Sequence, residues 1–498
     1  MSKLSVKATT LVHKNNSLPA QIGDGKSEKA AQFQEKLSFL PPKHGQYLTE
    51  MLFAGSFVSA IFLAARAALM ELFPKAFIGG LIRAKPTQAT QNNIVPFSQG
   101  GGDQGSSNSL NNSQSPTLIS IAQKVFSGQS QFNFPVALDE SFLEIPEYFA
   151  MYFMPTIASV SVLSRAIGGM LDINFEFLGQ PLHEYEKHLG KEVSVGTVQT
   201  KRLKITEAKL NKLAMGKTML TASVVALCGA LEYMVPSVRD FLTKWFLGYD
   251  DFSKLLGFDD ELKDPDYANP EKRAAKNIKD ALAFAFTSVT ALMGLTWLLS
   301  KKIENPKMGG FFRKTSKSFD LGRNFQLSNT PLAIILLVFS IPGYLNALRG
   351  KDEKLEVINR VILYSIPTII LYKQVVLNFL TYCSGLFFGL SGDLNGLFPK
   401  MKKQISEGKR DLLNWNMLSD FQYDKKSNEY SGMISKLPRL KTLKPEARKT
   451  FLRSVGMINK LPLILAPLIG MAINLFNLQK IFEMHQEEKK KLQHQFAQ

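Results

Sequence analysis

The sequence predicts an all-α, multi-pass transmembrane bundle of about seven spans, with a disordered loop and short interfacial helices. Seven apolar stretches each approach the roughly 20 residues that a helix needs to cross a bilayer. They cover residues 51–73, 148–171, 218–238, 281–300, 331–348, 361–390 and 461–478. The stretch 281–300 contains no charged residue, which is rare in a buried helix of a soluble protein. The mean hydropathy is near zero only because Lys-rich loops and a polar start dilute the spans.

The chain begins with a polar segment, 1–50, which we expect to lie on the inner side of the membrane. The first apolar run, 51–73, is long enough to cross the bilayer, so it is predicted to be a retained anchor and not a cleaved signal peptide. The following segment 85–116 is rich in Gln, Asn, Gly and Ser and has almost no charge. It is predicted to be disordered because it cannot bury enough apolar surface to order itself.

The membrane domain is predicted to extend over residues 51–390. Its sixth span, 361–390, is the most polar, and its 30 residues exceed the length that a single crossing needs. We expect one long or broken helix there; the alternative is two half-segments on one side, which would change the side of the C-terminus. A basic inner-face loop, 391–460, with 15 Lys and Arg then leads to the last span, 461–478, and a charged tail, 479–498.

Two extramembrane stretches have the composition of interfacial helices. In 241–258 aromatic residues alternate with Lys and Asp, and 432–461 is basic, periodic and interrupted by prolines. Amphipathic helices of this kind lie in the head-group layer of a membrane. A soluble helix packed on the rest of the protein would have the same pattern, so both interpretations are kept for these stretches.

The distribution of positive charge predicts the orientation. Alternate extramembrane segments, beginning with the N-terminal one, hold 37 of the 60 Lys and Arg, and the intervening segments hold 20. Cytoplasmic loops collect positive charge, so we expect an integral membrane protein with a cytoplasmic N-terminus, in the cell or inner membrane if the source is bacterial. The net charge of +18 then predicts contact with the anionic lipid head groups of the bilayer. Nucleic acid is not an expected partner, because the chain has no recognisable binding module for it.

Three ionisable residues inside the predicted spans are the candidate site. Arg66 and Glu232 lie at similar depth in the first and third spans, where they can form an ion pair, and Lys373 lies near the middle of the most polar span. A charge inside the bilayer costs about 2.5–3.5 kcal/mol on the insertion scale, so each needs a partner or a function. Arg165 lies closer to the predicted inner end of its span and is expected to reach the interface by snorkelling.

The sequence contains no recognisable catalytic, metal-binding or nucleotide-binding pattern. His183 and His188 are five positions apart, about 140° around a helix, whereas a helical zinc motif needs histidines four positions apart. The two cysteines, Cys228 and Cys383, fall within predicted spans and are expected to be small apolar fillers. We therefore predict no enzyme activity, no cofactor and no metal.

The expected function is that of a structural or interaction component of the membrane. The alternative is a secondary transporter whose substrate-binding residues are Lys373, Arg66 and Glu232. Prolines inside five of the spans are compatible with this alternative, because broken helices expose backbone groups to a substrate. Proline is nevertheless common in membrane helices of every kind, and an Arg66–Glu232 pair that only fixes helix packing is the simpler interpretation.

Overall fold

The described part of the protein is mostly helical in the computed structural model and includes two short β-hairpins. The predicted first span, 51–73, the predicted disordered loop, 85–116, and the candidate site residues Arg66 and Lys373 lie outside the described residues. The structure describes Leu48 and residues 133–195, 201–249, 252–256, 270–359, 374–424 and 427–496.

Four helices in the described part of the chain are long and apolar enough to cross a membrane. Each of them contains or overlaps one of the predicted spans from the second to the fifth. The prediction that these stretches form helices compatible with a membrane is therefore confirmed. The number is smaller than the seven predicted. The four helices are Phe134–Leu171, Glu207–Leu247, Pro270–Ser300 and Asn329–Asn346.

The first of these helices is a composite. Its pieces are α7 (Phe134–Tyr148), the π-helical turn η5 (Phe149–Phe153), α8 (Met154–Ala158), a second π-helical turn η6 (Ser159–Leu163) and α9 (Ser164–Leu171). The Asn133 side chain caps its start by accepting a hydrogen bond from the Val136 backbone N–H. Asp172, in the left-handed conformation with φ of 53°, ends it. The helix therefore begins 14 residues before the predicted second span.

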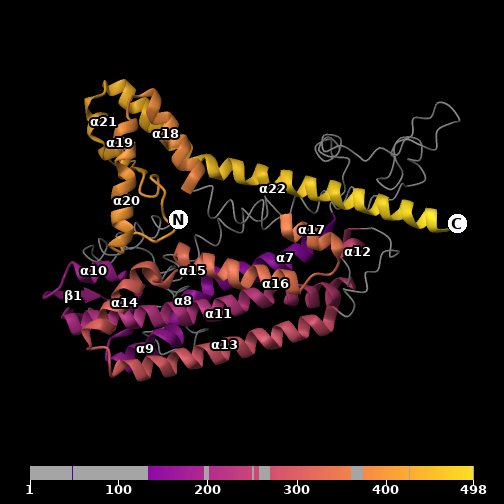
Figure 1. The fold of residues 1–498 in the computed structure, drawn as a ribbon, viewed down its shortest axis with the longest axis horizontal. Helices are drawn as coiled ribbons and strands as arrows, with labels where there is room; N and C mark the ends of the chain where they lie inside the picture. The colour runs from indigo at the N-terminus through magenta and orange to yellow at the C-terminus, as the bar shows by residue number, and fades with distance from the viewer. Residues whose placement is uncertain are drawn as a thin grey trace, which may run out of the picture.

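The helix α11 (Glu207–Leu247) is the centre of the bundle (Figure 1). Around it lie α7, α13 (Pro270–Ser300), α14 (Pro306–Ser318) and the composite of α15 (Asn329–Ile334), η11 (Ile335–Ser340) and α16 (Ile341–Asn346). Two glycines permit this close packing. A Cβ at Gly343 on α16 would lie 2.6 Å from the carbonyl oxygen of Tyr233, and a Cβ at Gly216 would lie 2.9 Å from Leu171.

The segments between the spans gather at two opposite ends of the bundle. At the α14 end lie α14, η7 (Phe175–Gly179), α10 (Leu182–Glu186), η10 (Arg323–Phe325) and a hairpin of β1 (Glu192–Val195) and β2 (Lys201–Lys204) that pairs Val193 with Leu203. At the α17 end lie α12 (Phe252–Leu256) and α17 (Lys351–Asn359). The predicted interfacial stretch 241–258 is not one helix, because residues 241–247 continue α11.

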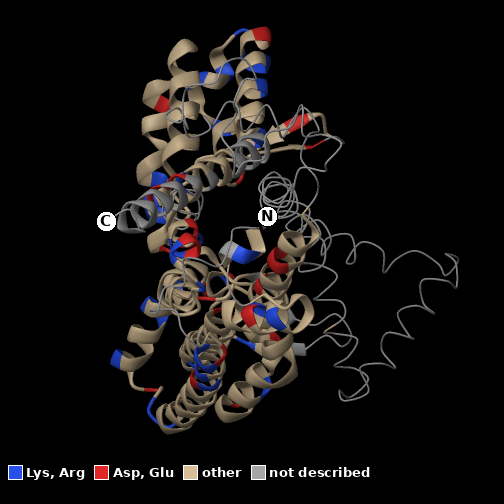
Figure 2. Ribbon diagram, turned by 90° about the vertical axis from the view of Figure 1, so that its right-hand side faces the viewer, with Lys and Arg blue, Asp and Glu red and all other residues tan. Residues whose placement is uncertain are grey.

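Residues 374–460 form a second helical unit with a core of its own. Its buried side chains include Leu394, Met401, Phe451 and Val455, so the predicted basic loop 391–460 is folded. Figure 2 shows several Lys and Arg on this unit. It consists of α18 (Leu377–Phe387), α19 (Ser391–Asn395), α20 (Leu397–Ser406), a hairpin of β3 (Gln422–Asp424) and β4 (Glu429–Ser431), η14 (Ile434–Lys436), α21 (Pro438–Thr442) and the start of α22 (Pro445–Phe496).

The long helix α22 connects this unit to the far end of the bundle (Figure 1). It contains the predicted last span, 461–478, and it reaches α17, where the Asn359 side chain donates a hydrogen bond of 2.8 Å to the side-chain oxygen of Asn477. At the other end of the unit, the Thr330 hydroxyl donates to Asp411 over 3.0 Å. The second unit is therefore attached to the bundle directly through Asp411, and to its α17 end through the continuation of α22.

Candidate functional site

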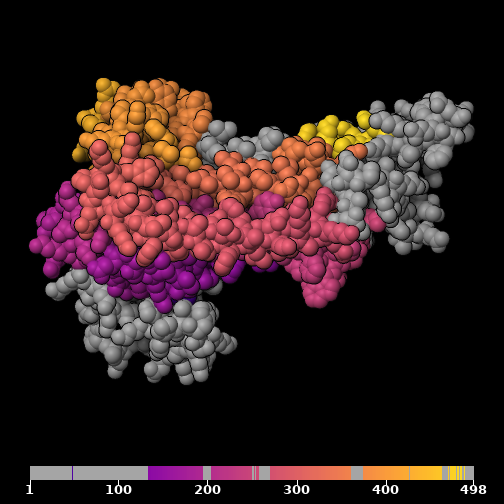
Figure 3. All heavy atoms as spheres, turned by 60° about the horizontal axis from the view of Figure 1, so that its bottom comes forward, coloured from indigo at the N-terminus to yellow at the C-terminus, as the bar shows by residue number. Residues whose placement is uncertain are grey.

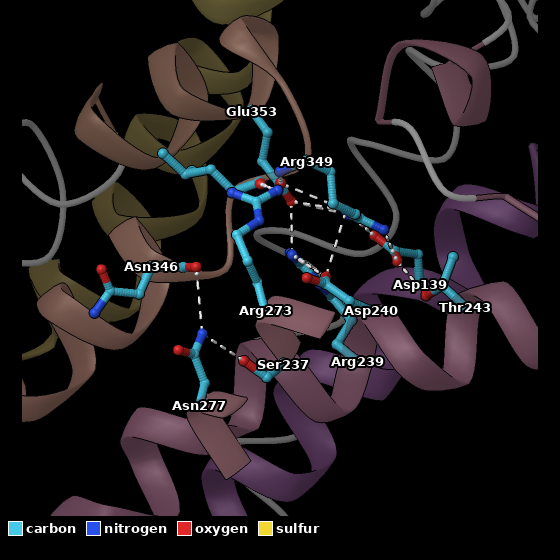
Figure 4. A network of polar contacts seen from close by, with 11 residues as sticks. Asp139, Ser237, Arg239, Asp240, Thr243, Arg273, Asn277, Asn346, Arg349 and Glu353 are labelled. Atoms are coloured by element: carbon cyan, nitrogen blue, oxygen red, sulfur yellow. Dashed lines mark hydrogen bonds and ion pairs between the residues drawn. The ribbon is translucent and has the colours of Figure 1, made fainter. Parts of the chain in front are cut away.

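Five charged side chains meet in a buried network at the α17 end of the bundle (Figure 4). None of these side chains is more than 7% exposed. Such burial is rare for charged residues unless they are paired, so this network, called here the ionic cluster, is the main candidate site in the described part of the chain. Its members are Asp139, Arg239, Asp240, Arg349 and Glu353.

Three helices and one connecting segment supply these side chains. Asp139 lies in the second turn of α7, Arg239 and Asp240 lie in the last turns of α11, and Glu353 lies in the first turn of α17. Arg349 comes from the short link between α16 and α17. The first turn of a helix favours carboxylates, because the free N–H groups there carry partial positive charge. The position of Glu353 therefore stabilises α17 and also brings its carboxylate to the cluster.

Arg349 is the hub of the cluster. Its guanidinium makes a two-pronged contact with Asp139, with Nη1–Oδ1 and Nη2–Oδ2 distances of 2.8 and 3.0 Å. The same Nη2 lies 2.9 Å from Oε1 of Glu353. The guanidinium carbon also stands 5.6 Å from the centre of the Phe252 ring, within cation–π range. This planar, bidentate geometry is the strong form of an Arg–carboxylate pair.

Arg239 completes the network from α11. Its Nη2 lies 2.7 Å from Oε1 of Glu353 and 2.7 Å from Oδ1 of Asp240. The Thr243 hydroxyl, one turn further along α11, donates a hydrogen bond to Asp139. Two guanidinium groups thus face three carboxylates, which leaves one formal negative charge inside the cluster.

The electrostatics favour the ionised forms of Glu353 and Arg349. Burial alone would raise the pKa of Glu353, but Arg239 and Arg349 outweigh it and hold the pKa of this carboxyl below its ordinary value. Burial alone would lower the pKa of Arg349, and the adjacent Asp139, Glu353 and Asp240 raise it well above its ordinary value.

Hydrogen bonds beside the cluster attach α13 to the same end of the bundle (Figure 4). The Asn277 side-chain amide lies 3.1 Å from the Ser237 hydroxyl and 3.3 Å from the carbonyl oxygen of Asn346. Arg273 donates to the carbonyl oxygen of Leu348 over 2.9 Å. Ion pairs and hydrogen bonds together therefore join α7, α11, α13 and α17 and hold these helices together at this end of the bundle.

A second buried ion pair lies at the α14 end. The ammonium of Lys217, only 1% exposed, lies 2.8 Å from Oδ1 of Asp320 and donates to the carbonyl oxygen of Leu178 over 3.1 Å. Burial raises the pKa of Asp320 to about 6, although Lys217 acts in the opposite direction. The neighbouring Leu321 backbone N–H donates to Thr221 over 3.0 Å, so the 301–328 segment is anchored on α11.

Of the three predicted site residues, the structure describes Glu232. It is 1% exposed in the middle of α11, and Oε2 accepts a hydrogen bond of 3.3 Å from the Ser340 hydroxyl at the end of η11. Its Oε1 has no hydrogen-bond partner among the described residues. Because Arg66 and Lys373 lie outside these residues, the predicted Arg66–Glu232 pair stays a prediction.

The polar residues that follow Lys373 in the sequence make contacts inside the second helical unit. The Asn378 amide nitrogen donates to the carbonyl oxygen of Trp415 over 2.6 Å, and its oxygen accepts from the Met417 N–H over 2.9 Å. Gln374 donates to the carbonyl oxygen of Leu413. These contacts hold the 413–417 segment against α18, so the polarity of this stretch has a structural explanation.

The other residues singled out in the sequence have ordinary surroundings. Cys228 is fully buried in the bundle core, and Cys383 is partly buried. His183 lies in α10 and contacts the neighbouring Glu184, with Nε2 and Oε1 3.0 Å apart. Within the described ranges, no group of three or more His, Cys, Asp or Glu side chains is arranged to hold a metal ion.

Comparisons of the chain with protein families, with curated proteins and with solved structures found no match. The class of protein that the fold and the site define is a mostly helical protein with four helices compatible with membrane insertion and a buried ionic fastening at one end.

Proposed function

We propose that this chain is a multi-pass membrane protein that serves as a structural or interaction component of its membrane. The contrast between α11 and α13 carries this proposal. In the most apolar window of α11, 72% of the residues are buried inside the protein, whereas in that of α13 only 11% are. The bundle is thus closed around α11 and presents α13 outward.

The outward face of α13 is strongly apolar. Phe286 is 77% exposed, Leu298 57% and Leu282 54%. Figure 3 shows α13 running across the exposed surface of the bundle. An apolar surface of this extent is unusual for a soluble monomer and fits contact with lipid chains or with the helix of a partner.

The proposed topology has seven spans and a cytoplasmic N-terminus. This topology adds three further spans to the four helices named above, at residues 51–73, 361–390 and 461–478. The location of the loops supports this topology. The described parts of the predicted inner loops 172–217 and 301–330 lie together at the α14 end, and α20 of the second unit lies against α14.

The second candidate function is that of a secondary transporter. The observation that favours it is the environment of Glu232, a buried carboxylate with one oxygen unpartnered among the described residues, beside the π-helical turn η11. π-Helical turns occur frequently at functional sites. In this alternative, Glu232 would bind substrate or carry a proton together with Arg66 and Lys373.

The native Cys228 distinguishes the two functions, because it lies one helical turn before Glu232. In a Cys383→Ala variant, Cys228 is the only thiol that a membrane-impermeant maleimide can label. A structural component predicts protection in intact membranes and labelling after denaturation. Rapid labelling in the native state would show an aqueous path to Glu232 and would overturn the structural proposal in favour of the transporter.

Two further single cysteines serve as positive controls for labelling and report the side of the membrane on which each position lies. In a Cys228→Ala, Cys383→Ala background, Lys402→Cys and Lys272→Cys place thiols on exposed positions of α20 and α13. Both should label readily, and the proposed orientation predicts that they react from opposite sides of the membrane, Lys402→Cys from the cytoplasmic side. Labelling of both from one side would contradict the proposed topology.

A further inference from the structure

A basic pocket lies at the α14 end, between α14 and the end of α20. It is a cavity of about 370 Å³, which is within the size range of small-molecule sites. Its lining is polar and dominated by positive charge, unlike the mostly apolar lining of an ordinary ligand pocket. The lining residues are Glu186, Gly310, Arg313, Lys314, Lys317 and Ser406.

Helical geometry places the basic side chains on one face. Gly310, Arg313, Lys314 and Lys317 are at positions i, i+3, i+4 and i+7 of α14, so they share the face that borders the pocket. Like charges at this spacing destabilise an isolated helix, because the side chains are neighbours on its surface. An anion bound between them would remove this repulsion.

The acidic residues near the pocket do not neutralise it. Glu186 lies 3.6 Å from the ammonium of Lys317, and Glu407 pairs with Lys403 and Lys409. Arg313 and Lys314 form no ion pair with any residue in the described part of the chain. Two positive charges therefore remain available to a ligand.

Two adjacent glycines in α14 have different roles. A Cβ at Gly309 would collide with the side chain of Asn211, so packing explains that glycine. A Cβ at Gly310 would have no atom within 4 Å, so packing does not require a glycine there. Glycine inside a helix is destabilising relative to alanine, and at Gly310 its effect is to leave the wall of the pocket open.

The surroundings of the pocket have the composition of a membrane interface. The last turn of the preceding helix α13 carries Trp297, which is 52% exposed and whose ring centre lies 4.6 Å from the Lys301 ammonium. Phe311 on α14, next to Gly310, is 62% exposed. Exposed aromatic and basic side chains together are characteristic of the head-group layer, where phosphate groups are abundant.

We propose that this pocket binds a phosphate group, and that its source is the head group of an anionic membrane phospholipid. Arg313 and Lys314 supply the charge-assisted hydrogen bonds, and Gly310 supplies the space. The choice of a lipid head group over free phosphate rests on the membrane insertion proposed above. The binding of a phosphate group does not.

The test is a titration of the purified full-length protein in nonionic detergent with dihexanoyl phosphatidic acid, and separately with inorganic phosphate. The variants are Arg313→Gln with Lys314→Gln, which removes the two available charges, and Gly310→Glu, which places a carboxylate in the open pocket. The matched control is Lys400→Gln with Lys402→Gln, which removes two exposed charges from α20 outside the pocket.

We expect both pocket variants to bind the lipid about tenfold more weakly or worse, and the control to bind it as the unmodified protein does. Equal weakening by the two double variants would indicate diffuse charge attraction and would overturn the proposal, as would unchanged binding by Gly310→Glu. If inorganic phosphate displaces the lipid at a concentration similar to that of the lipid, the site binds free phosphate. If lipid binding is unaffected by inorganic phosphate, the head group is the ligand. The Cys228 labelling described above does not depend on this pocket, so failures of the two proposals are distinguishable.

Discussion

Arg349 contacts the Glu353 carboxylate with both its backbone and its side chain. The backbone N–H of Arg349 donates to Oε2 of Glu353 over 2.6 Å, and the guanidinium Nη2 donates to Oε1 over 2.9 Å. One carboxylate thus satisfies a free N–H at the start of α17 and also orients the arginine toward Asp139. The beginning of a short helix and the buried charge network therefore form together.

Replacement of Arg349 by Met should destabilise the protein strongly. It would leave Asp139 and Glu353 with less compensating charge in a buried site, and loss of one partner of a buried pair costs about 3–5 kcal/mol. The free energy of unfolding in detergent measures this loss. Arg453→Met, at an exposed position of α22, is the matched control and should change stability little. Equal effects of the two substitutions would contradict a structural role for the cluster.

The stability contributed by Glu353 should disappear in acid. The pKa of Glu353 is lowered in the folded protein, so its stabilising effect is complete above the ordinary pKa of 4.5 and is lost as the pH falls through the lowered value. We therefore expect the stability difference between the unmodified protein and Glu353→Gln to be constant at neutral pH and to shrink below about pH 4.5. Thermal unfolding over a pH series measures it. Glu304→Gln, at an exposed site, provides the comparison; a difference for Glu353→Gln that grows in acid would refute the assignment.

Gly343 should not tolerate a side chain. A Cβ there would lie 2.6 Å from the backbone oxygen of Tyr233, which cannot rotate away, so Gly343→Ala should push α16 from α11 and cost about 1–3 kcal/mol. Gly294→Ala on α13, where a Cβ would have no atom within 4 Å, should instead stabilise the helix by about 0.5–1 kcal/mol. Thermal unfolding of the two variants tests this difference in sign. Similar unfolding temperatures for both would show that α16 does not pack closely on α11.

The predicted Arg66–Glu232 pair is tested by a double-mutant cycle. If the two side chains are paired, the effects of Arg66→Ala and Glu232→Ala on the free energy of unfolding should be non-additive by about 0.5–3 kcal/mol. Additive effects would exclude the pair. The described contact of Glu232 with Ser340 offers a positive control, because Glu232→Ala and Ser340→Ala should also be coupled.

The helices of the bundle could be predicted from hydropathy, but their lengths could not. The predicted span 218–238 lies inside α11, which begins at Glu207 and ends at Leu247. Hydropathy windows detect only the apolar middle of such a helix, and the turns that carry Lys209, Lys212 and Arg239 lower the average. Tertiary packing and the cap supplied by Thr206 extend the helix beyond the window.

The ionic cluster was missed for a related reason. Its members fall just outside the predicted spans, where charged residues are ordinarily assigned to loops. Asp139 and Arg349 are 210 residues apart in the sequence, and no local pattern signals their contact. Only the spacing of Arg349 and Glu353, four residues apart, could have indicated a pair. The folded unit within 391–460 was missed because its buried leucines are interspersed with lysines.

The length of α22 gives the protein a mechanical connection. A continuous helix of 52 residues extends roughly 80 Å, more than twice the thickness of a bilayer core. One end packs in the core of the second unit through Phe451 and Val455. Further along, Asn477 is hydrogen-bonded to Asn359 at the end of α17, the helix that carries Glu353 in its first turn. A displacement of the second unit would therefore be transmitted along α22 to α17, at the opposite end of the bundle.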